Sequence, residues 1–226
     1  MSLRISVIIP AAGLSRRMEG FLKRKPFILL GGRPVIAHAL DVLRKLGGVK
    51  EIILVVNKKD LKATGAHFGG RRVKIIEGAS TRSGSVYNGI KVLNPGCDIV
   101  LIHDAVRPFV TADMAQRCIR AAGRFGAAVC AVPVVPTIKS ADSHGFVAST
   151  SDRSRLWEVQ TPQAFKRDLI IKAFKNAGRL NSSITDDAML VERMGRKVKL
   201  VMGSYRNIKI TTPNDIKIAE GILRCE

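Results

Sequence analysis

Short β-branched runs alternate with segments of helical spacing along the first half of the chain. The runs cover residues 5–9, 51–56, 73–77 and 98–102, and the helical segments include residues 35–46 and 85–93. This alternation is typical of β-α-β units built around a parallel sheet. Near-continuous apolar strands suit a sheet that is covered on both faces. We therefore predict a mainly parallel α/β fold, whose ligands bind beyond the carboxyl ends of the strands.

The alternating pattern ends after residues 127–139, "AAVCAVPVVPTIK". Two short strand-like pieces then flank a turn at residues 142–145, which predicts a β-hairpin projecting at about residues 136–155. An exposed hairpin serves as a lid or as a dimerisation arm, and a surface loop is the alternative. Helical spacing returns in three segments, at residues 168–177, 186–194 and 214–223. Because no repeat or linker divides the chain, we predict one domain over residues 1–226.

The formal net charge is +20 at pH 7, from 38 basic and 18 acidic residues. Such an excess raises nucleic acid, an anionic membrane surface or a phosphorylated small molecule as partners, and charge alone does not choose among them. Aromatic residues make up 5% of the chain and no RNP1-like motif is present, which disfavours nucleic acid. No segment approaches the ~20 apolar residues of a membrane-spanning helix, so no membrane partner is expected.

The cysteines are spread along the chain without a C-x-x-C pair: Cys97, Cys118, Cys130 and Cys225. The sequence therefore encodes neither a zinc site nor a disulfide framework. A reducing, cytoplasmic location is the expectation. The apolar run at residues 5–14 resembles a short signal segment, but it fits better as a buried strand because a charged, helix-like sequence follows it.

The loop after the first strand sets small residues beside cations. Ala11, Ala12 and Gly13 present almost no side chain, so their backbone N–H groups can lie against a phosphate or a nucleobase. Arg17 and Lys25 would then supply countercharge. The loop matches neither a P-loop nor the G-x-G-x-x-G fingerprint, and an ordinary strand-to-helix turn is the alternative.

Two other strand ends lead into polar loops. In "EGASTRSGSVYNGI", residues 77–90, Arg82 and Ser85 make a ligand loop credible, although the hydroxyl residues there could act only as helix caps. In "LIHDAVRPF", residues 101–109, Asp104 suits Mg²⁺ or a ribose hydroxyl, because hard cations prefer oxygen ligands. Local pairing of Asp104 with Arg107 is the alternative, and the lone His103 is interpreted as structural.

Weaker candidates lie further along the chain, in segments that carry Arg153, Thr161, Thr185, Asp186 and Lys209. Each is a weak signal alone, because Thr-Pro and Thr-Asp pairs are routine helix starts. No convincing Ser-His-Asp or Cys-His arrangement is present for nucleophilic catalysis.

Taken in order, a series of segments resembles the 2-C-methyl-D-erythritol 4-phosphate cytidylyltransferases of the non-mevalonate isoprenoid pathway. The segments are "PAAGLSRRM", "KPF", "EGASTRSGSVYNGI", "HDAVRP", "VPVVPTIK", "LWEVQTPQAF", "TDDAMLVERMG" and "NIKITTPNDI". The resemblance covers nearly the whole chain and implies a single Rossmann-like nucleotidyltransferase domain. The implied reaction transfers CMP from CTP to methylerythritol phosphate and releases pyrophosphate, with Mg²⁺ on the triphosphate. A ribitol-5-phosphate cytidylyltransferase is the closest alternative, because that family shares the fold and most motifs.

The resemblance also assigns roles to individual residues. It implies catalytic cations at Arg17, Lys25 and Lys209, and nucleotide-binding residues at Ala11, Ala12, Gly13, Ala79, Arg82 and Ser85. It places the sugar phosphate against Asp104, Arg107, Thr137, Arg153, Thr161 and Thr185, with Asp104 also near the metal. In this family the hairpin that carries Thr137 and Arg153 reaches into the neighbouring subunit's site, which implies a homodimer. Ala79 and Ser80 depart from the family, which often has a second Gly and an Asp there.

The residues agree with this chemistry. A phosphate monoester has its second pKa near ~6, so at neutral pH it is already an anionic nucleophile and needs no general base. Bringing that anion in line to an α-phosphate calls for positioning and cations. Arg17, Lys25, Lys209 and Mg²⁺ fit this requirement. A catalytically inactive dimeric scaffold is disfavoured, because the cations that the family uses are present.

Overall fold

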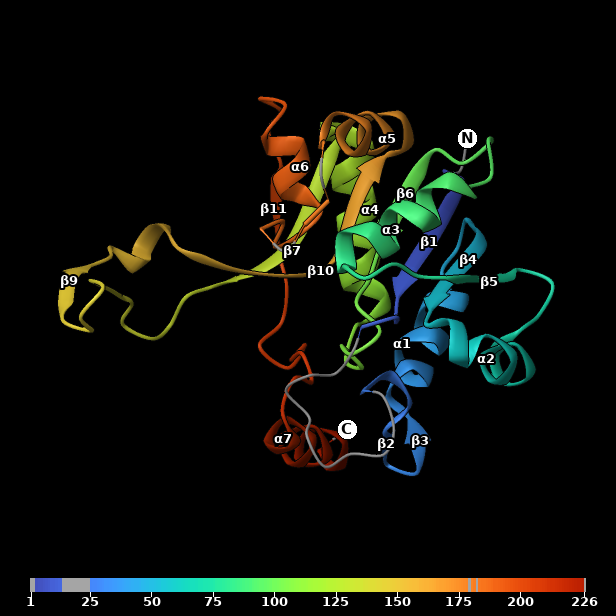
Figure 1. Ribbon diagram of the computed structural model, residues 1–226, viewed down its shortest axis with the longest axis horizontal. Helices are drawn as coiled ribbons and strands as arrows, with labels where there is room; N and C mark the ends of the chain where they lie inside the picture. The colour runs from blue at the N-terminus through green and yellow to red at the C-terminus, as the bar shows by residue number, and fades with distance from the viewer. Residues whose placement is uncertain (1–2, 14–24, 179, 182, 226) are drawn as a thin grey trace.

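The computed structural model describes residues 3–13, 25–178, 180–181 and 183–225, with only the backbone described at Lys25. Figure 1 shows a sheet with helices on both faces and a narrow hairpin that projects away from it. The strands are β1 (Ile5–Pro10), β2 (Leu29–Leu30), β3 (Arg33–Pro34), β4 (Val49–Val56), β5 (Val73–Glu77), β6 (Ile99–Ile102), β7 (Ala127–Pro133), β8 (Lys139–Ala141), β9 (Val147–Thr150), β10 (Trp157–Lys166) and β11 (Lys199–Met202). The α-helices are α1 (Val35–Arg44), α2 (Leu61–Phe68), α3 (Arg82–Lys91), α4 (Ala112–Phe125), α5 (Arg167–Asn176), α6 (Ala188–Glu192) and α7 (Pro213–Arg224), and single 3-10 turns lie at η1 (Lys25–Phe27), η2 (Lys58–Asp60) and η3 (Arg153–Arg155).

The main sheet has seven strands in the order β11-β7-β10-β6-β1-β4-β5. Neighbouring strands pair in parallel except at β10, which runs antiparallel to both β6 and β7. The predicted mainly parallel α/β fold is therefore confirmed. Strand β10 was not predicted from the sequence. The interpretation of Thr-Pro as a routine helix start is wrong for Thr161–Pro162, which lies inside this strand with a cis peptide bond.

Both faces of the sheet are buried, as the apolar strands predict. On β1, Val7 and Ile9 contribute to the core on the α1 and α4 side, whereas Ile8 contributes to the core under α3, α5 and α6. All three side chains are fully buried. Alternate residues of a strand point to opposite faces, so one apolar run fills both cores. The residues after β1, β5 and β6 are thereby held at one edge of a rigid sheet.

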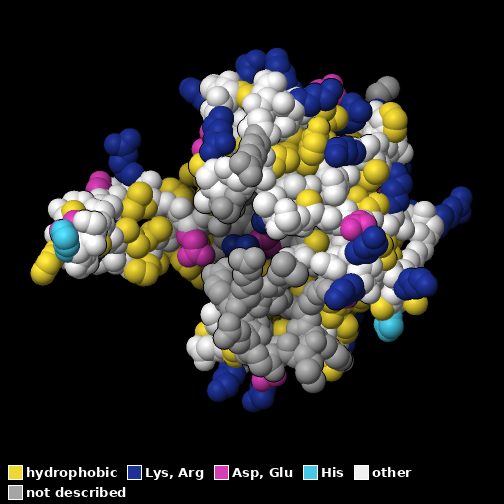
Figure 2. Space-filling view, in the orientation of Figure 1, with side chains coloured by type: hydrophobic (Ala, Val, Ile, Leu, Met, Phe, Trp, Pro, Cys, Tyr) yellow, Lys and Arg dark blue, Asp and Glu magenta, His cyan; other side chains and the backbone are white. Residues whose placement is uncertain are grey.

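Strands β8 and β9 pair as the predicted hairpin and form the tip of a long arm (Figure 1). Its turn is held by Asp142, whose Oδ1 accepts the backbone N–H groups of His144 and Phe146 at 2.9 Å each. Phe146 and Val147 at the tip are 73% and 63% exposed. Figure 2 shows hydrophobic side chains gathered along this arm. Exposed apolar side chains gathered in this way commonly mark an interaction surface.

Candidate functional site

A cavity of about 330 Å³ opens beyond the carboxyl end of β6, between β10, the start of α6 and the segment before α7. Its lining is mostly polar and mixes cations, carboxylates, amides and hydroxyls. The lining residues are Arg82, Asp104, Arg107, Val159, Gln160, Thr161, Gln163, Thr185, Asp186, Met189, Glu192 and Lys209. This is the edge of the sheet where ligands are expected in a parallel α/β fold.

Asp104 is the buried anion of the cavity, and cations hold both of its carboxylate oxygens. Arg82 Nε lies 2.8 Å from Oδ1, and Lys209 Nζ lies 2.7 Å from Oδ2. Burial would raise the pKa of Asp104, but Arg82 and Lys209 hold that pKa far below its usual range. The alternative considered for this loop, a local pair with Arg107, is not the arrangement found, because Arg107 Nη1 donates to the Asn207 carbonyl oxygen at 2.7 Å.

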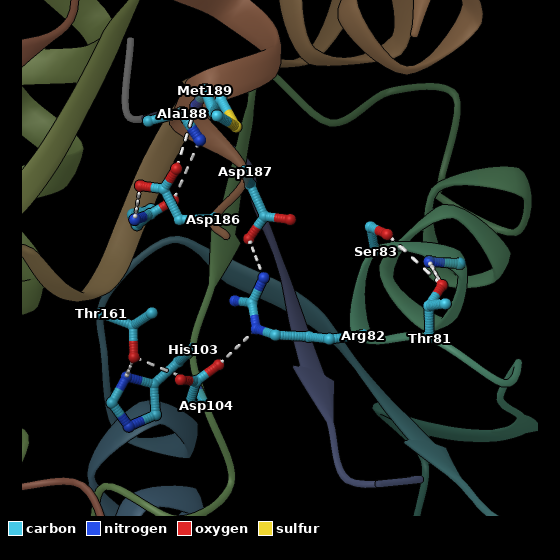
Figure 3. Close-up of polar contacts among 12 residues, drawn as sticks. Thr81, Arg82, Ser83, His103, Asp104, Thr161, Asp186, Asp187, Ala188 and Met189 are labelled. Carbon is cyan, nitrogen blue, oxygen red and sulfur yellow. Dashed lines mark hydrogen bonds and ion pairs between the residues drawn. The ribbon is translucent and has the colours of Figure 1, made fainter. Parts of the chain in front are cut away.

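Arg82 reaches from the first turn of α3 to two carboxylates at once (Figure 3). Besides Asp104, it contacts Asp187 at the start of α6, where Nη1 lies 2.9 Å from Oδ2. Burial raises the pKa of Asp187 in spite of this contact. Burial alone would lower the pKa of Arg82, but the paired carboxylates raise it, so the guanidinium stays charged. Arg82 thus ties two elements of the cavity wall together.

Asp186 and Gln163 fix the start of α6 on the other side of the cavity. Gln163 Nε2 donates to Asp186 Oδ2 at 2.8 Å, and Gln163 Oε1 accepts the backbone N–H of Ala188 at 3.2 Å. Asp186 Oδ1 accepts the backbone N–H of Met189 at 3.1 Å. These bonds satisfy donors that the first turn of a helix leaves unpaired. The orientation of α6, and with it Asp187, is therefore set by β10.

Thr161 enters the cavity because β10 is bulged. Val159 lies opposite Ala131 and Gln163 lies opposite Val129, so four residue steps of β10 face two steps of β7. A bulge interrupts the alternation of side chains and changes where they point. The Thr161 hydroxyl accepts the backbone N–H of Asp104 at 3.0 Å, which joins the bulge to the loop after β6.

The predicted nucleotide loops lie at the ends of β1 and β5. Ala11 and Ala12 are buried and Gly13 is exposed, directly after β1. A Cβ at Gly78, the residue after β5, would collide with the Cβ of Ala12, so glycine there lets the two loops touch. The Ser85 hydroxyl accepts the N–H of Ala79 at 3.0 Å and is itself buried, so it shapes the backbone of that exposed loop.

Several predicted residues lie elsewhere. Arg17 lies outside the described residues, as does the side chain of Lys25, which begins η1. Thr137 and Arg153 are exposed on the arm, where Arg153 Nη1 donates to the Val135 carbonyl oxygen. The cavity itself gathers seven predicted residues, Arg82, Asp104, Arg107, Thr161, Thr185, Asp186 and Lys209. Gln160, Gln163 and Asp187 were not predicted as site residues, because no local pattern in the sequence gives a signal for them.

The candidate metal ligand has no clustered partners. Within the described ranges, no group of three or more His, Cys, Asp or Glu side chains is arranged to hold a metal ion. Asp104 thus offers one carboxylate, and any bound ion would take its other ligands from a substrate or water. A membrane-spanning helix is also missing from the described part of the chain, since none of its helices is both long and apolar enough.

Comparison with known proteins gives one consistent result. The family model described as 2-C-methyl-D-erythritol 4-phosphate cytidylyltransferase matches residues 5–225. Proteins of that name from Caldanaerobacter subterraneus and Clostridioides difficile are 42% and 44% identical to this chain, over 98% of it in both cases and over 100% and 94% of their own lengths. A crystal structure of 4-diphosphocytidyl-2C-methyl-D-erythritol synthase from Anaerococcus prevotii superimposes with a TM-score of 0.85 at 36% identity, covering 98% of this chain and 96% of that one.

Proposed function

Because this chain belongs to the 2-C-methyl-D-erythritol 4-phosphate cytidylyltransferase family, we propose that its cavity at Asp104 is where the sugar-alcohol phosphate meets CTP. The chain transfers a cytidylyl group from CTP to 2-C-methyl-D-erythritol 4-phosphate, as the non-mevalonate pathway requires. The observation that carries the site assignment is the gathering of seven predicted residues, from distant parts of the sequence, around one cavity.

The chemistry needs no general base from the protein. An oxygen of the acceptor phosphate forms a bond to the α-phosphorus of CTP, the bond from that phosphorus to the bridging oxygen of the β-phosphate breaks, and pyrophosphate leaves. The acceptor phosphate is already anionic at neutral pH, so the chain must mainly position two anions and offset their charge. Lys209 suits this role, because its side chain is 38% exposed at the cavity and its ammonium group already pairs with an anion, Asp104.

Mg²⁺ is the cofactor we propose. Hard cations bind through carboxylate and phosphate oxygens, and a magnesium ion on a triphosphate commonly takes only one or two protein carboxylates. Asp104, buried and held ionised by its neighbours, fits that requirement. When bound, the ion would neutralise part of the triphosphate charge. The nucleotide side of the site would be formed by Ala11, Ala12, Gly13, Ala79 and Ser85, with Arg17 and Lys25 as further cations.

We also propose a homodimer assembled through the arm. Exposed apolar side chains at Val135, Phe146 and Val147 support this assignment, because monomers rarely leave such side chains clustered on a projecting element. Thr137 and Arg153 would then act in the cavity of the second copy. A reducing, cytoplasmic setting is proposed as well, supported by the free thiols of the described cysteines.

The test is pyrophosphate release from CTP and Mg²⁺ with methylerythritol phosphate or ribitol 5-phosphate as acceptor, measured in parallel. We expect strong release with methylerythritol phosphate and at most weak release with ribitol 5-phosphate. Release with ribitol 5-phosphate alone would keep the fold and the mechanism but overturn the acceptor. A Lys209→Ala variant with unchanged turnover would overturn the site.

A further inference from the structure

His103 is fully buried beside the cavity, and both of its ring nitrogens have partners. Nε2 lies 3.0 Å from the carbonyl oxygen of Arg107. Nδ1 lies 3.1 Å from the hydroxyl oxygen of Thr161, a contact that Figure 3 shows. A carbonyl oxygen can only accept a hydrogen bond, so Nε2 must carry the proton. The contacts therefore select one tautomer of the neutral ring.

The Thr161 hydroxyl must then donate. The ring is fully buried, and its two nitrogens contact a carbonyl oxygen and a hydroxyl, neither of which can offset a buried positive charge, so the ring is neutral and Nδ1 is an acceptor. Of the charged groups around the ring, Asp104 favours its charged form, whereas Arg107 and Arg82 favour its neutral form. The single hydroxyl proton of Thr161 is thus directed at Nδ1.

The hydrogen bonds that the Thr161 hydroxyl can still form follow from the number of its protons and lone pairs. A hydroxyl has one proton and two lone pairs. The proton goes to His103, and one lone pair accepts the backbone N–H of Asp104 at 3.0 Å. One lone pair is left for the cavity that Thr161 lines. Toward a ligand, Thr161 can accept a hydrogen bond but cannot donate one.

We propose that His103 is a positioning residue that, by accepting the Thr161 proton, makes Thr161 an acceptor for a hydroxyl group of the sugar-alcohol substrate and not a donor to its phosphate. This inference rests on the proposed function. A phosphate oxygen placed on Thr161 would meet a lone pair, which is repulsive, whereas a polyol hydroxyl can donate. The phosphate must then lie beside the cations of the cavity. The hydrogen bonds that link His103, Thr161 and Asp104 thereby determine which end of the acceptor faces Thr161.

A matched pair of substitutions separates the two contacts of His103. An amide oxygen in His103→Asn can stand near Nδ1 and still accept from Thr161, whereas His103→Gln extends toward the Arg107 carbonyl and leaves the Thr161 proton without its acceptor. We expect His103→Gln to raise the KM for methylerythritol phosphate roughly tenfold, the effect of one lost hydrogen bond, with the KM for CTP unchanged. We expect His103→Asn to restore most of this loss. Equal effects of the two substitutions would overturn the proposal.

Thr161→Val supplies the second arm. It should raise the KM for methylerythritol phosphate at least as much as His103→Gln, since it also removes the acceptor of the Asp104 N–H. The double variant should be no worse than Thr161→Val alone, because both substitutions act through one hydroxyl. Additive losses would overturn the proposal. Inorganic phosphate, used as a competitive inhibitor, should bind Thr161→Val as well as the wild type, and weakened inhibition would place the phosphate on Thr161 instead.

Nitrogen-detected NMR of the histidine ring gives a readout that does not depend on turnover. We expect the Nε2–H tautomer in the free protein near pH 7, and the Nδ1–H tautomer or a charged ring would refute the argument. If the wild-type chain proves inactive with methylerythritol phosphate while the ring shows the Nε2–H tautomer, the proposed function fails and the hydrogen-bond chain stands. An active wild type with the other tautomer would overturn the hydrogen-bond chain and leave the proposed function intact.

Discussion

Acid should destabilise the fold through His103 in a way that can be isolated and measured. The pKa of the buried ring is about 4, against about 6.5 for an exposed histidine in the unfolded chain. Between these pH values His103 is protonated in the unfolded state but not in the folded state, so the free energy of unfolding falls as pH falls. At pH 5 the linkage amounts to about 2 kcal/mol, while at pH 7.5 it is close to zero.

The assay is urea denaturation of the wild type and of His103→Asn at pH 7.5 and at pH 5. Asparagine does not titrate, and its packing defect is the same at both pH values, so subtracting the two pH dependences leaves the His103 contribution. Titrations shared by both proteins, including that of Asp104, cancel. The wild type should lose about 2 kcal/mol more than the variant between pH 7.5 and pH 5. Equal losses would mean that burial does not lower the pKa of the ring.

Three further predictions test the rest of the site. Gly78→Ala should lower the free energy of unfolding by about 1–3 kcal/mol in urea denaturation, because the added methyl group has to displace Ala12; no change would contradict the close approach of the loops. Lys209→Ala should reduce kcat roughly 10²–10³-fold with the fold intact by circular dichroism, and a near-normal kcat would remove it from the site. Arg153→Ala and Lys25→Ala should each be inactive as homodimers, yet mixing them should restore one active site in each mixed dimer; if no activity returns, Arg153 does not act across subunits.

The sequence predicted the fold where its signals are local. The apolar runs of β1, β4, β5 and β6 and the helices between them follow from periodicity, and the loops after those strands contain Asp104 and Arg82 as expected. A mainly parallel sheet was sufficient to place these loops at one edge. This part of the site could be predicted before any coordinates.

The rest depends on contacts between distant residues. Arg82 and Asp187 are separated by 105 positions, and no local pattern connects them. Gln163 is part of β10, whose sequence contains a proline and several polar residues and was therefore not recognised as a strand. The bulge in β10 also interrupts the regular alternation of apolar and polar residues that would identify a strand. The hydrogen-bond partners of His103 could not be predicted either, because the position of the ring proton depends on which groups the fold places beside each ring nitrogen.

The place of β10 in the sheet also dictates an order of events during synthesis. It lies between β6 and β7, although both of those strands precede it in the chain. Until residue 166 has left the ribosome, β6 lacks its neighbour on one side and β7 has none, and both carry buried apolar residues throughout. Unpaired apolar strand edges are templates for association with other chains. The nascent protein is therefore most exposed to aggregation just before the strand that carries Thr161 is inserted, and that insertion fills the centre of the sheet and adds one wall of the substrate cavity, which residues 185–209 complete later.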